Sequence, residues 1–165
     1  MLAAGLLAVA ALALTGCASD PPSAVVGLTV TGCPPGTANG TGVLVEPGLI
    51  LTSAHVVKGA DEITVTNGEH RTTAEIVAFD PEMDLAYLRV TTPVSPVRIA
   101  AREIEPGTPG VAYVYRHGEV VTVPVVINRS IRIHTEDIYV EGDTYRRGFE
   151  LEADIRAGDS GGPVM

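Results

Sequence analysis

The sequence predicts an all-β protein. Glycine and proline are frequent, with 18 and 12 copies in 165 residues, and they separate short runs that are rich in Val and Thr. Closely spaced runs of this kind between turn-forming residues are typical of many short antiparallel strands. Past residue 17 no segment has a sustained helical period of apolar residues. We therefore expect no long helix in the folded part of the chain.

The chain begins with an apolar run that predicts export. Residues 1–14 carry no charge. The run is shorter than the about 20 residues that a membrane-spanning helix needs, but it has the length of a signal-peptide core. No Lys or Arg precedes Lys58, so the basic opening of such a signal is absent; either the start lies further upstream or the signal is weak. We expect residues 1–16 to be a signal peptide.

A cysteine follows directly. Leu14-Thr15-Gly16-Cys17 resembles a lipobox, in which the mature protein begins at a cysteine that carries lipid. Two acyl chains suffice for stable anchoring, and residues 17–24, rich in Pro and Ser, would form the tether. We expect a lipoprotein held through Cys17 at the outer face of the bacterial cytoplasmic membrane. An ordinary type I signal ending and a truncated transmembrane helix remain the alternatives for this segment.

The rest of the chain divides at a proline-containing segment. Residues 25–91 include Val- and Thr-rich runs such as 63–66. Residues 92–109 contain four prolines and predict a linker, because proline is excluded from central strands. Residues 110–165 include two further runs, 119–126 and 128–135, that we expect to be strands. The proline-containing segment thus separates two groups of expected strands.

Charge and histidine spacing exclude several classes of function. The net charge of −9 and the pI of about 4.8 argue against a nucleic-acid partner, which requires a basic surface. Three histidines, His70, His117 and His134, lack the spacing of metal ligands. We predict no metal and no cofactor.

The most informative segment is Gly158-Asp159-Ser160-Gly161-Gly162-Pro163. Because Gly158 has no side chain, its N–H can turn inward beside that of Ser160 and form a two-donor oxyanion hole. A serine hydroxyl is a poor nucleophile at neutral pH, so it also needs a general base and a group that orients this base.

Two residues upstream can supply these roles. His55 lies in the segment Leu51-Thr52-Ser53-Ala54-His55-Val56-Val57, and Asp84 precedes the run Leu85-Ala86-Tyr87-Leu88. Taken alone, such a histidine is most often a packing or capping residue and such an aspartate a turn residue. Together with Ser160, in the chain order His, Asp, Ser, they indicate a catalytic triad.

These motifs resemble those of trypsin-like serine proteases. The interval of 29 positions between His55 and Asp84 is short, as in the bacterial HtrA-like branch, whose Gly-Thr-Gly strand motif is matched by Gly40-Thr41-Gly42. Asp137-Ile138-Tyr139 and the approach to the serine from Glu152 are similar to actinobacterial periplasmic serine proteases of the MarP type. The resemblance covers roughly residues 25–165.

The resemblance implies two antiparallel six-stranded β-barrels of the chymotrypsin type, with the triad between them. Residues 25–91 would form the first barrel and residues 110–165 the second. In this family the strands after the serine complete the second barrel and bind substrate as an added strand. We therefore expect the second barrel to be truncated at the C-terminus, and the chain to be a fragment of a longer gene. The resemblance also implies a serine endopeptidase acting on protein or peptide substrates outside the cytoplasmic membrane.

The resemblance raises three further expectations. Cys33 is either half of a disulfide whose partner is missing here or a buried thiol. Asp154, six positions before Ser160, is a candidate for selecting basic substrate side chains, as in trypsins. Asp159 pairs in trypsins with a newly cut N-terminal ammonium, a switch that a tethered N-terminus would lack. The alternative functions are a noncatalytic, protease-like peptide-binding lipoprotein and an inactive fragment of a longer protease.

Overall fold

The computed structural model describes residues 22–32, 36–100 and 103–165. The predicted signal peptide, Cys17 and Cys33 lie outside these residues. Within the described part the chain is all-β, as predicted, and its one helix is the four-residue α1, Ala54–Val57. No helix in these ranges has the length and apolar character needed to cross a bilayer.

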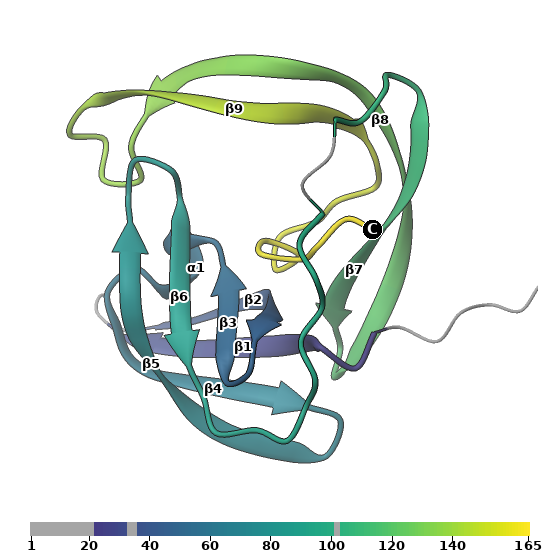
Figure 1. The fold of residues 1–165 in the computed structure, drawn as a ribbon. Helices are drawn as coiled ribbons and strands as arrows, with labels where there is room; N and C mark the ends of the chain where they lie inside the picture. The colour runs from purple at the N-terminus through teal and green to yellow at the C-terminus, as the bar shows by residue number, and fades with distance from the viewer. Residues whose placement is uncertain (1–21, 33–35, 101–102) are drawn as a thin grey trace, which may run out of the picture.

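The first six strands close into an antiparallel barrel (Figure 1). Around the barrel the order is β1-β2-β3-β6-β5-β4, and β1 closes it by pairing with both β2 and β4. The strands are β1 Val25–Gly32, β2 Gly36–Glu46, β3 Leu49–Thr52, β4 Ala60–Asn67, β5 His70–Asp80 and β6 Leu85–Arg89. The predicted closed first barrel is therefore present.

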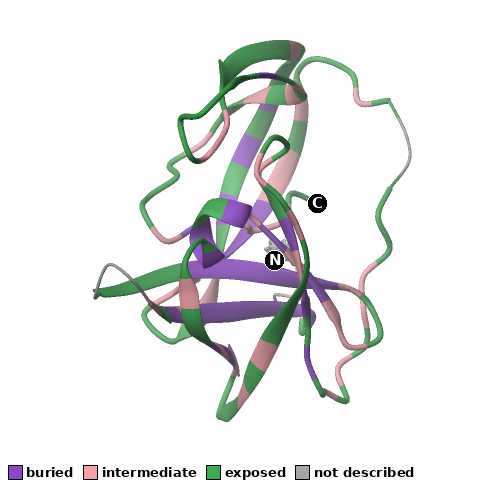
Figure 2. Ribbon diagram, turned by 90° about the vertical axis from the view of Figure 1, so that its left-hand side faces the viewer, coloured by how far each residue is buried: buried purple, intermediate pink, exposed green. Residues whose placement is uncertain are grey.

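The core of the protein lies inside this barrel, as the buried strands in the lower part of Figure 2 show. Its largest fully buried side chains are Leu28, Leu44, Ile50, Leu88, Val25, Val26, Val57 and Val114, together with the hydroxyl-bearing Thr41 and Thr52. Of these, only Val114 belongs to the second half of the chain. Burial of apolar area, which drives folding, is thus concentrated in the first barrel.

The second half of the chain forms a three-stranded antiparallel sheet and not a closed barrel. Its strands are β7 Thr108–Arg116, β8 Glu119–Glu136 and β9 Asp143–Glu152, in the order β7-β8-β9. Its own buried cluster is small, comprising Ala112, Val114, Val123 and Val125. Large apolar side chains of β9 such as Phe149 and Leu151 are exposed. The second barrel is incomplete in this chain, as the sequence predicted.

One strand differs from the sequence expectation. The runs 119–126 and 128–135 are parts of a single 18-residue strand, β8, and not two strands. The register with β9 shifts between Ile127 and Arg129, so Asn128 is an extra residue opposite the partner strand. A β-bulge accommodates such a residue by bending the strand without ending it. The bend lets β8 and β9 continue as the long ribbon that crosses the top of Figure 1.

Two tight hairpins carry charged residues next to their turns. The β4–β5 hairpin turns at Gly68, which has φ +58°. The β7–β8 hairpin turns through His117 and Gly118, both with positive φ, at 52° and 93°. Two consecutive positive φ angles define the type I′ turn, whose twist matches antiparallel strands. Arg71 follows the first of these turns and Arg116 precedes the second.

Candidate active site

His55 is presented by the single turn of helix α1. β3 ends at Thr52, and α1 buries Ala54, Val56 and Val57 in the barrel core. The same helical turn directs the His55 side chain outward, where 45% of its surface is exposed. Packing of its neighbours therefore holds the imidazole at the surface of the first barrel.

Asp84 binds the His55 segment through three contacts. Its backbone carbonyl accepts a hydrogen bond from the Ala54 N–H at 3.1 Å. One carboxylate oxygen accepts from the His55 backbone N–H at 2.9 Å, and the other lies 2.8 Å from His55 Nδ1. Asp84 has φ +58°, a left-handed conformation that aspartate tolerates better than most residues. The aspartate thus holds both the backbone and the ring of the histidine.

This geometry sets the histidine tautomer. An ionised carboxylate only accepts hydrogen bonds, so the proton of the neutral ring lies on Nδ1. Nε2 is then unprotonated and can accept a proton from a nucleophile. This arrangement is the one that a general base and its orienting group require.

Two successive tight turns shape the loop that carries Ser160. The Asp159 N–H donates to the Arg156 carbonyl, and the Gly162 N–H donates to the Asp159 carbonyl, both at 3.1 Å. The third residue of each turn is a glycine, Gly158 with φ +97° and Gly161 with φ +86°. Positive φ at this position is the mark of a type II turn and favours glycine. The spacing of glycines around Ser160 follows from these two turns.

The same turns leave two backbone donors free. Within the described part of the chain, the N–H groups of Gly158 and Ser160 donate no backbone hydrogen bond, whereas the N–H of Asp159 between them does. Free backbone donors on either side of a bound one are what an oxyanion hole needs.

The serine loop lies against the segment that carries His55. The Thr41 N–H donates to the Ser160 carbonyl at 2.8 Å, and a Cβ on Gly161 would collide with Thr52 Oγ1. Among the described residues no hydrogen bond joins the Ser160 hydroxyl to the His55 ring. Such contacts are often long in unliganded proteases and tighten when substrate binds.

Comparison with known proteins decides the family. The family model for a trypsin-like peptidase domain matches residues 40–165. The chain belongs to the trypsin-like serine proteases. It is 36% identical over 129 residues to the serine protease Rv3671c of Mycobacterium tuberculosis (strain H37Rv), a match that covers 76% of this chain and 32% of that protein. It is 31% identical over 134 residues to a probable periplasmic serine endoprotease, DegP-like, of Halomonas elongata, covering 76% of this chain and 26% of the relative.

Solved structures of this family agree with the fold. The active form of the Rv3671c protease from M. tuberculosis matches with a TM-score of 0.84 at 32% identity, over 88% of this chain and 66% of that one. Its inactive form matches with a TM-score of 0.74 at 33% identity, over 87% and 71%. The HtrA-type protease AlgW with a tripeptide matches with a TM-score of 0.73 at 28% identity, over 87% of this chain and 47% of that one. This trypsin-like protease spans about a third of the length of its first curated relatives.

A buried ion pair that the sequence did not reveal holds the serine loop of the protease. Asp159 is 4% exposed, and its carboxylate accepts from Arg116 Nε at 2.8 Å and from Arg116 Nη2 at 2.5 Å. The Arg156 N–H adds a third hydrogen bond at 2.7 Å. Arg116 comes from the β7–β8 hairpin, 43 positions away, so no local pattern marks it. The cation that trypsins take from a cut N-terminus is supplied here by a side chain.

This ion pair predicts a pH-dependent stability. The hydrogen bonds from Arg116 hold the pKa of Asp159 below its usual range, against the opposing effect of burial. When the pKa of an aspartate is lower in the folded than in the unfolded protein, the ionised group stabilises the fold at pH values above its unfolded pKa of about 3.9. This contribution is lost as the pH falls through the pKa of the folded state. Arg116→Met should therefore destabilise the protein at pH 7, and the deficit relative to wild type should shrink below about pH 4.

Urea unfolding of both proteins at a series of pH values measures this deficit. Arg129→Met is the matched control, because the Arg129–Glu150 pair on the β8–β9 ribbon is exposed and such pairs contribute little. A deficit for Arg116→Met that equals that of Arg129→Met, or that does not change with pH, would contradict a stabilising role for the buried pair.

A second unpredicted cation lies beside Asp84. Arg146 Nη1 on β9 is 3.8 Å from the Asp84 carboxylate, and Arg146 Nε donates to the Glu82 carbonyl at 2.6 Å. Ile138, in the turn between β8 and β9, lies against the loop that precedes Asp84. Its N–H donates to the Pro81 carbonyl at 3.3 Å. The β8–β9 ribbon of the second half thus braces the loop that carries Asp84.

The candidate specificity residue Asp154 has its own partner. Its exposed carboxylate accepts from Arg156 Nη2 at 2.6 Å, and this contact lowers its pKa. Asp154 borders a hollow between β8 and the end of β9, apart from the hydrogen bonds that join His55 and Asp84. Selection of basic side chains by Asp154 stays a prediction, and Arg156 would have to be displaced for it. In residues 22–32, 36–100 and 103–165 no three candidate metal ligands gather.

Proposed function

We propose that the protein containing this chain is a serine endopeptidase with His55, Asp84 and Ser160 as its triad. The observation that carries the proposal is the double contact of the Asp84 carboxylate with His55, at 2.9 Å to the backbone N–H and 2.8 Å to Nδ1. Two findings support the proposal. The chain belongs to the trypsin-like family, and its fold matches the active form of the Rv3671c protease with a higher TM-score than the inactive form.

The proposed reaction has two stages, acylation of the serine and hydrolysis of the acyl-enzyme, and the same groups act in both. Ser160 Oγ attacks the scissile carbonyl carbon while His55 Nε2 takes its proton. The N–H groups of Gly158 and Ser160 stabilise the negative oxygen of the tetrahedral intermediate. His55 then gives the proton to the leaving amine, and a water molecule hydrolyses the acyl-enzyme by the same steps. Asp84 stabilises the imidazolium and does not take up the proton.

A fluorophosphonate probe tests the proposal directly, because it reacts covalently with an activated serine. The protein that contains this chain should be labelled at Ser160, and its His55→Ala variant should lose the label. Ser130→Ala, which changes an exposed serine on β8, is the control and should label as wild type does. Labelling that persists in His55→Ala would show that His55 is not the activating base. A wild-type protein containing this chain that binds peptides without being labelled would favour the noncatalytic peptide-binding alternative.

We further propose that the protein is exported and anchored by lipid on Cys17, on the evidence of the apolar run 1–14 and Leu14-Thr15-Gly16-Cys17. The name of the Halomonas elongata relative as a probable periplasmic endoprotease agrees with an exported location. Metabolic labelling with a radioactive fatty acid should mark the wild-type protein and not Cys17→Ser. Cys33→Ser, which keeps the lipobox, serves as the control. An unlabelled wild-type protein would overturn the lipid anchor and favour a type I signal.

A further inference from the structure

A pocket borders the loop that carries Ser160. It has a volume of about 470 Å³ and lies between β2 and the two hairpins β4–β5 and β7–β8. Gly158, whose N–H is one of the proposed oxyanion donors, is part of its lining, as is Gly40 of β2. A carbonyl oxygen held by Gly158 would therefore lie at the edge of this pocket. Groups one or two residues along an extended substrate reach about 3.3–3.6 Å further per residue.

The lining of this pocket is cationic in an acidic protein. Arg71, Arg116, His117 and Arg156 line it, and no Asp or Glu does, although the chain carries a net charge of −9. Two of the three arginines have partners: Arg116 binds the buried Asp159, and Arg156 binds Asp154. Arg71 forms no ion pair among the described residues. One full positive charge in the pocket is therefore available for a ligand.

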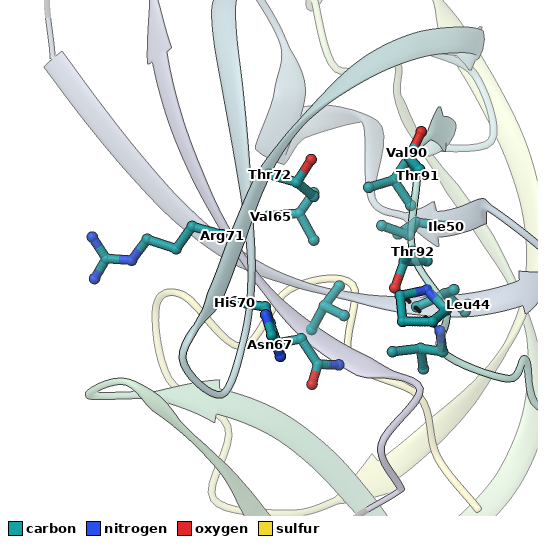
Figure 3. Close-up of a pocket in the computed structure, with 13 residues that line it drawn as sticks. Leu44, Ile50, Val65, Asn67, His70, Arg71, Thr72, Val90, Thr91 and Thr92 are labelled. Carbon is teal, nitrogen blue, oxygen red and sulfur yellow. Dashed lines mark hydrogen bonds between the residues drawn. The ribbon is translucent and has the colours of Figure 1, made fainter.

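Arg71 faces this pocket from the β4–β5 hairpin. Figure 3 shows a separate apolar cavity inside the first barrel, bordered by Leu44, Ile50 and Val65, and the guanidinium of Arg71 projects away from it. On the outer side Arg71 lies near Tyr115: burial raises the pKa of the Tyr115 phenol, and the positive charge of Arg71 opposes this shift. Tyr115 is itself part of the cationic pocket, and its hydroxyl donates to the Gly118 carbonyl at 2.8 Å.

The direction of the substrate follows from the proposed proton transfers. His55 must give its proton to the leaving amine, so the peptide beyond the scissile bond has to pass the face of the first barrel that carries His55. Gly40 connects that face to the pocket, because a Cβ there would lie 2.5 Å from Val56 Cγ1, next to His55, and 3.3 Å from the Ser160 carbonyl oxygen. Substrate residues after the bond therefore lead from Ser160 into the cationic pocket.

We infer that this pocket is a specificity site for an acidic side chain within two residues after the scissile bond, with Arg71 as its main determinant. A guanidinium forms paired, charge-assisted hydrogen bonds to a carboxylate, which an amide of the same size cannot match. Because this chain carries a net charge of −9, selection for acidic peptides has to come from this local reversal of charge. The inference rests on the proposed endopeptidase function for the direction of the substrate.

Matched peptides test the inference. A fluorogenic peptide is made with Glu, Gln or Lys at each of the two positions after the bond. For the wild-type protein that contains this chain we expect kcat/KM to be about five- to tenfold higher for Glu than for Gln at one of these positions, the scale of one partly exposed charge pair. This ratio should fall towards one at about 1 M salt, where the Debye length is only about 3 Å.

Substitution of Arg71 identifies the determinant. Arg71→Gln should reduce the ratio of Glu to Gln to about twofold or less, and Arg71→Glu should reverse the order so that the Lys peptide is preferred. A purely structural role of Arg71 would not reverse the preference. Arg132→Gln changes an exposed arginine on β8 that forms no ion pair within the described chain, and it should keep the wild-type ratio. Equal rates for Glu and Gln in wild type, or an unchanged ratio in Arg71→Gln, would overturn the inference.

A binding experiment separates this inference from the proposed function. The Ser160→Ala chain is titrated with the same peptides, each carrying a fluorophore, and anisotropy is followed. Tighter binding of the Glu peptide that depends on Arg71 supports the pocket even where no serine labelling or turnover occurs. Serine labelling with no preference for Glu in either assay leaves the endopeptidase intact and refutes the acidic specificity.

Discussion

Ser160→Ala is expected to abolish peptide hydrolysis almost completely and to lower kcat by a factor on the order of 10⁶. The triad acts as a unit, so loss of the nucleophile leaves only the catalysis that comes from binding and from the oxyanion donors, about 10³–10⁴ over the reaction in water. The glycine turns around Ser160 hold the loop through the backbone, and Asp159 holds it through Arg116. Alanine at position 160 should therefore leave the loop in place.

Steady-state hydrolysis of a fluorogenic peptide or of a general protein substrate measures this loss. Thermal unfolding of the same variant should match wild type, which shows that activity was lost through chemistry and not through misfolding. Ser130→Ala provides the control for the loss of a serine elsewhere and should keep full activity. Hydrolysis by Ser160→Ala within tenfold of wild type would refute the assignment of the nucleophile.

Asp84→Asn is expected to lower kcat by about 10⁴ while the fold persists. The carbonyl oxygen of the new asparagine could still accept from the His55 backbone N–H, but its amide group would then donate to Nδ1. Nδ1 would have to be the acceptor, the ring proton would move to Nε2, and the base would no longer accept a proton from Ser160. The two side chains have nearly the same size and shape, so the effect comes from the tautomer.

Kinetics and NMR together test this reason. The nitrogen resonances of the His55 ring should report a protonated Nδ1 in wild type and a protonated Nε2 in the variant. Asp61→Asn, which changes an exposed aspartate on β4, removes the same charge from the same barrel and should change kcat little. A loss of less than tenfold in Asp84→Asn, or the wild-type tautomer in its spectrum, would show that Asp84 does not orient the base.

Much of the proposed site could be named from local patterns because its parts have local causes. Gly158 and Gly161 occupy the third positions of two tight turns, a conformation that favours glycine wherever it occurs. His55 follows a strand whose apolar neighbours must be buried, and Asp84 stands in a turn before the next strand. The all-β class could be predicted from short Val- and Thr-rich runs, and the incomplete second barrel from the resemblance to trypsin-like proteases, in which further strands follow the serine.

Other features could not be predicted because they arise where distant segments pack. The expected break in β8 was wrong because a single bulge at Asn128 absorbs the irregularity and pairing with β9 continues on both sides. Arg146 reaches the loop before Asp84 from 64 positions away. The residues next to an arginine in a strand do not indicate whether its side chain faces solvent or the carboxylate of a proposed triad, so this contact could not be predicted.

Short segments of the sequence account for the all-β fold, the hairpin turns and the choice of the three candidate catalytic residues, since strand propensity, positive φ and side-chain chemistry are local properties. The distribution of charge around these residues depends instead on how the chain packs. Arg116 neutralises the buried Asp159, and Arg71 forms no ion pair in the described chain, beside a pocket that the β7–β8 and β4–β5 hairpins line together. Electrostatic interactions act through space, and their strength depends on burial and distance. Neither quantity can be read from the order of residues along the chain.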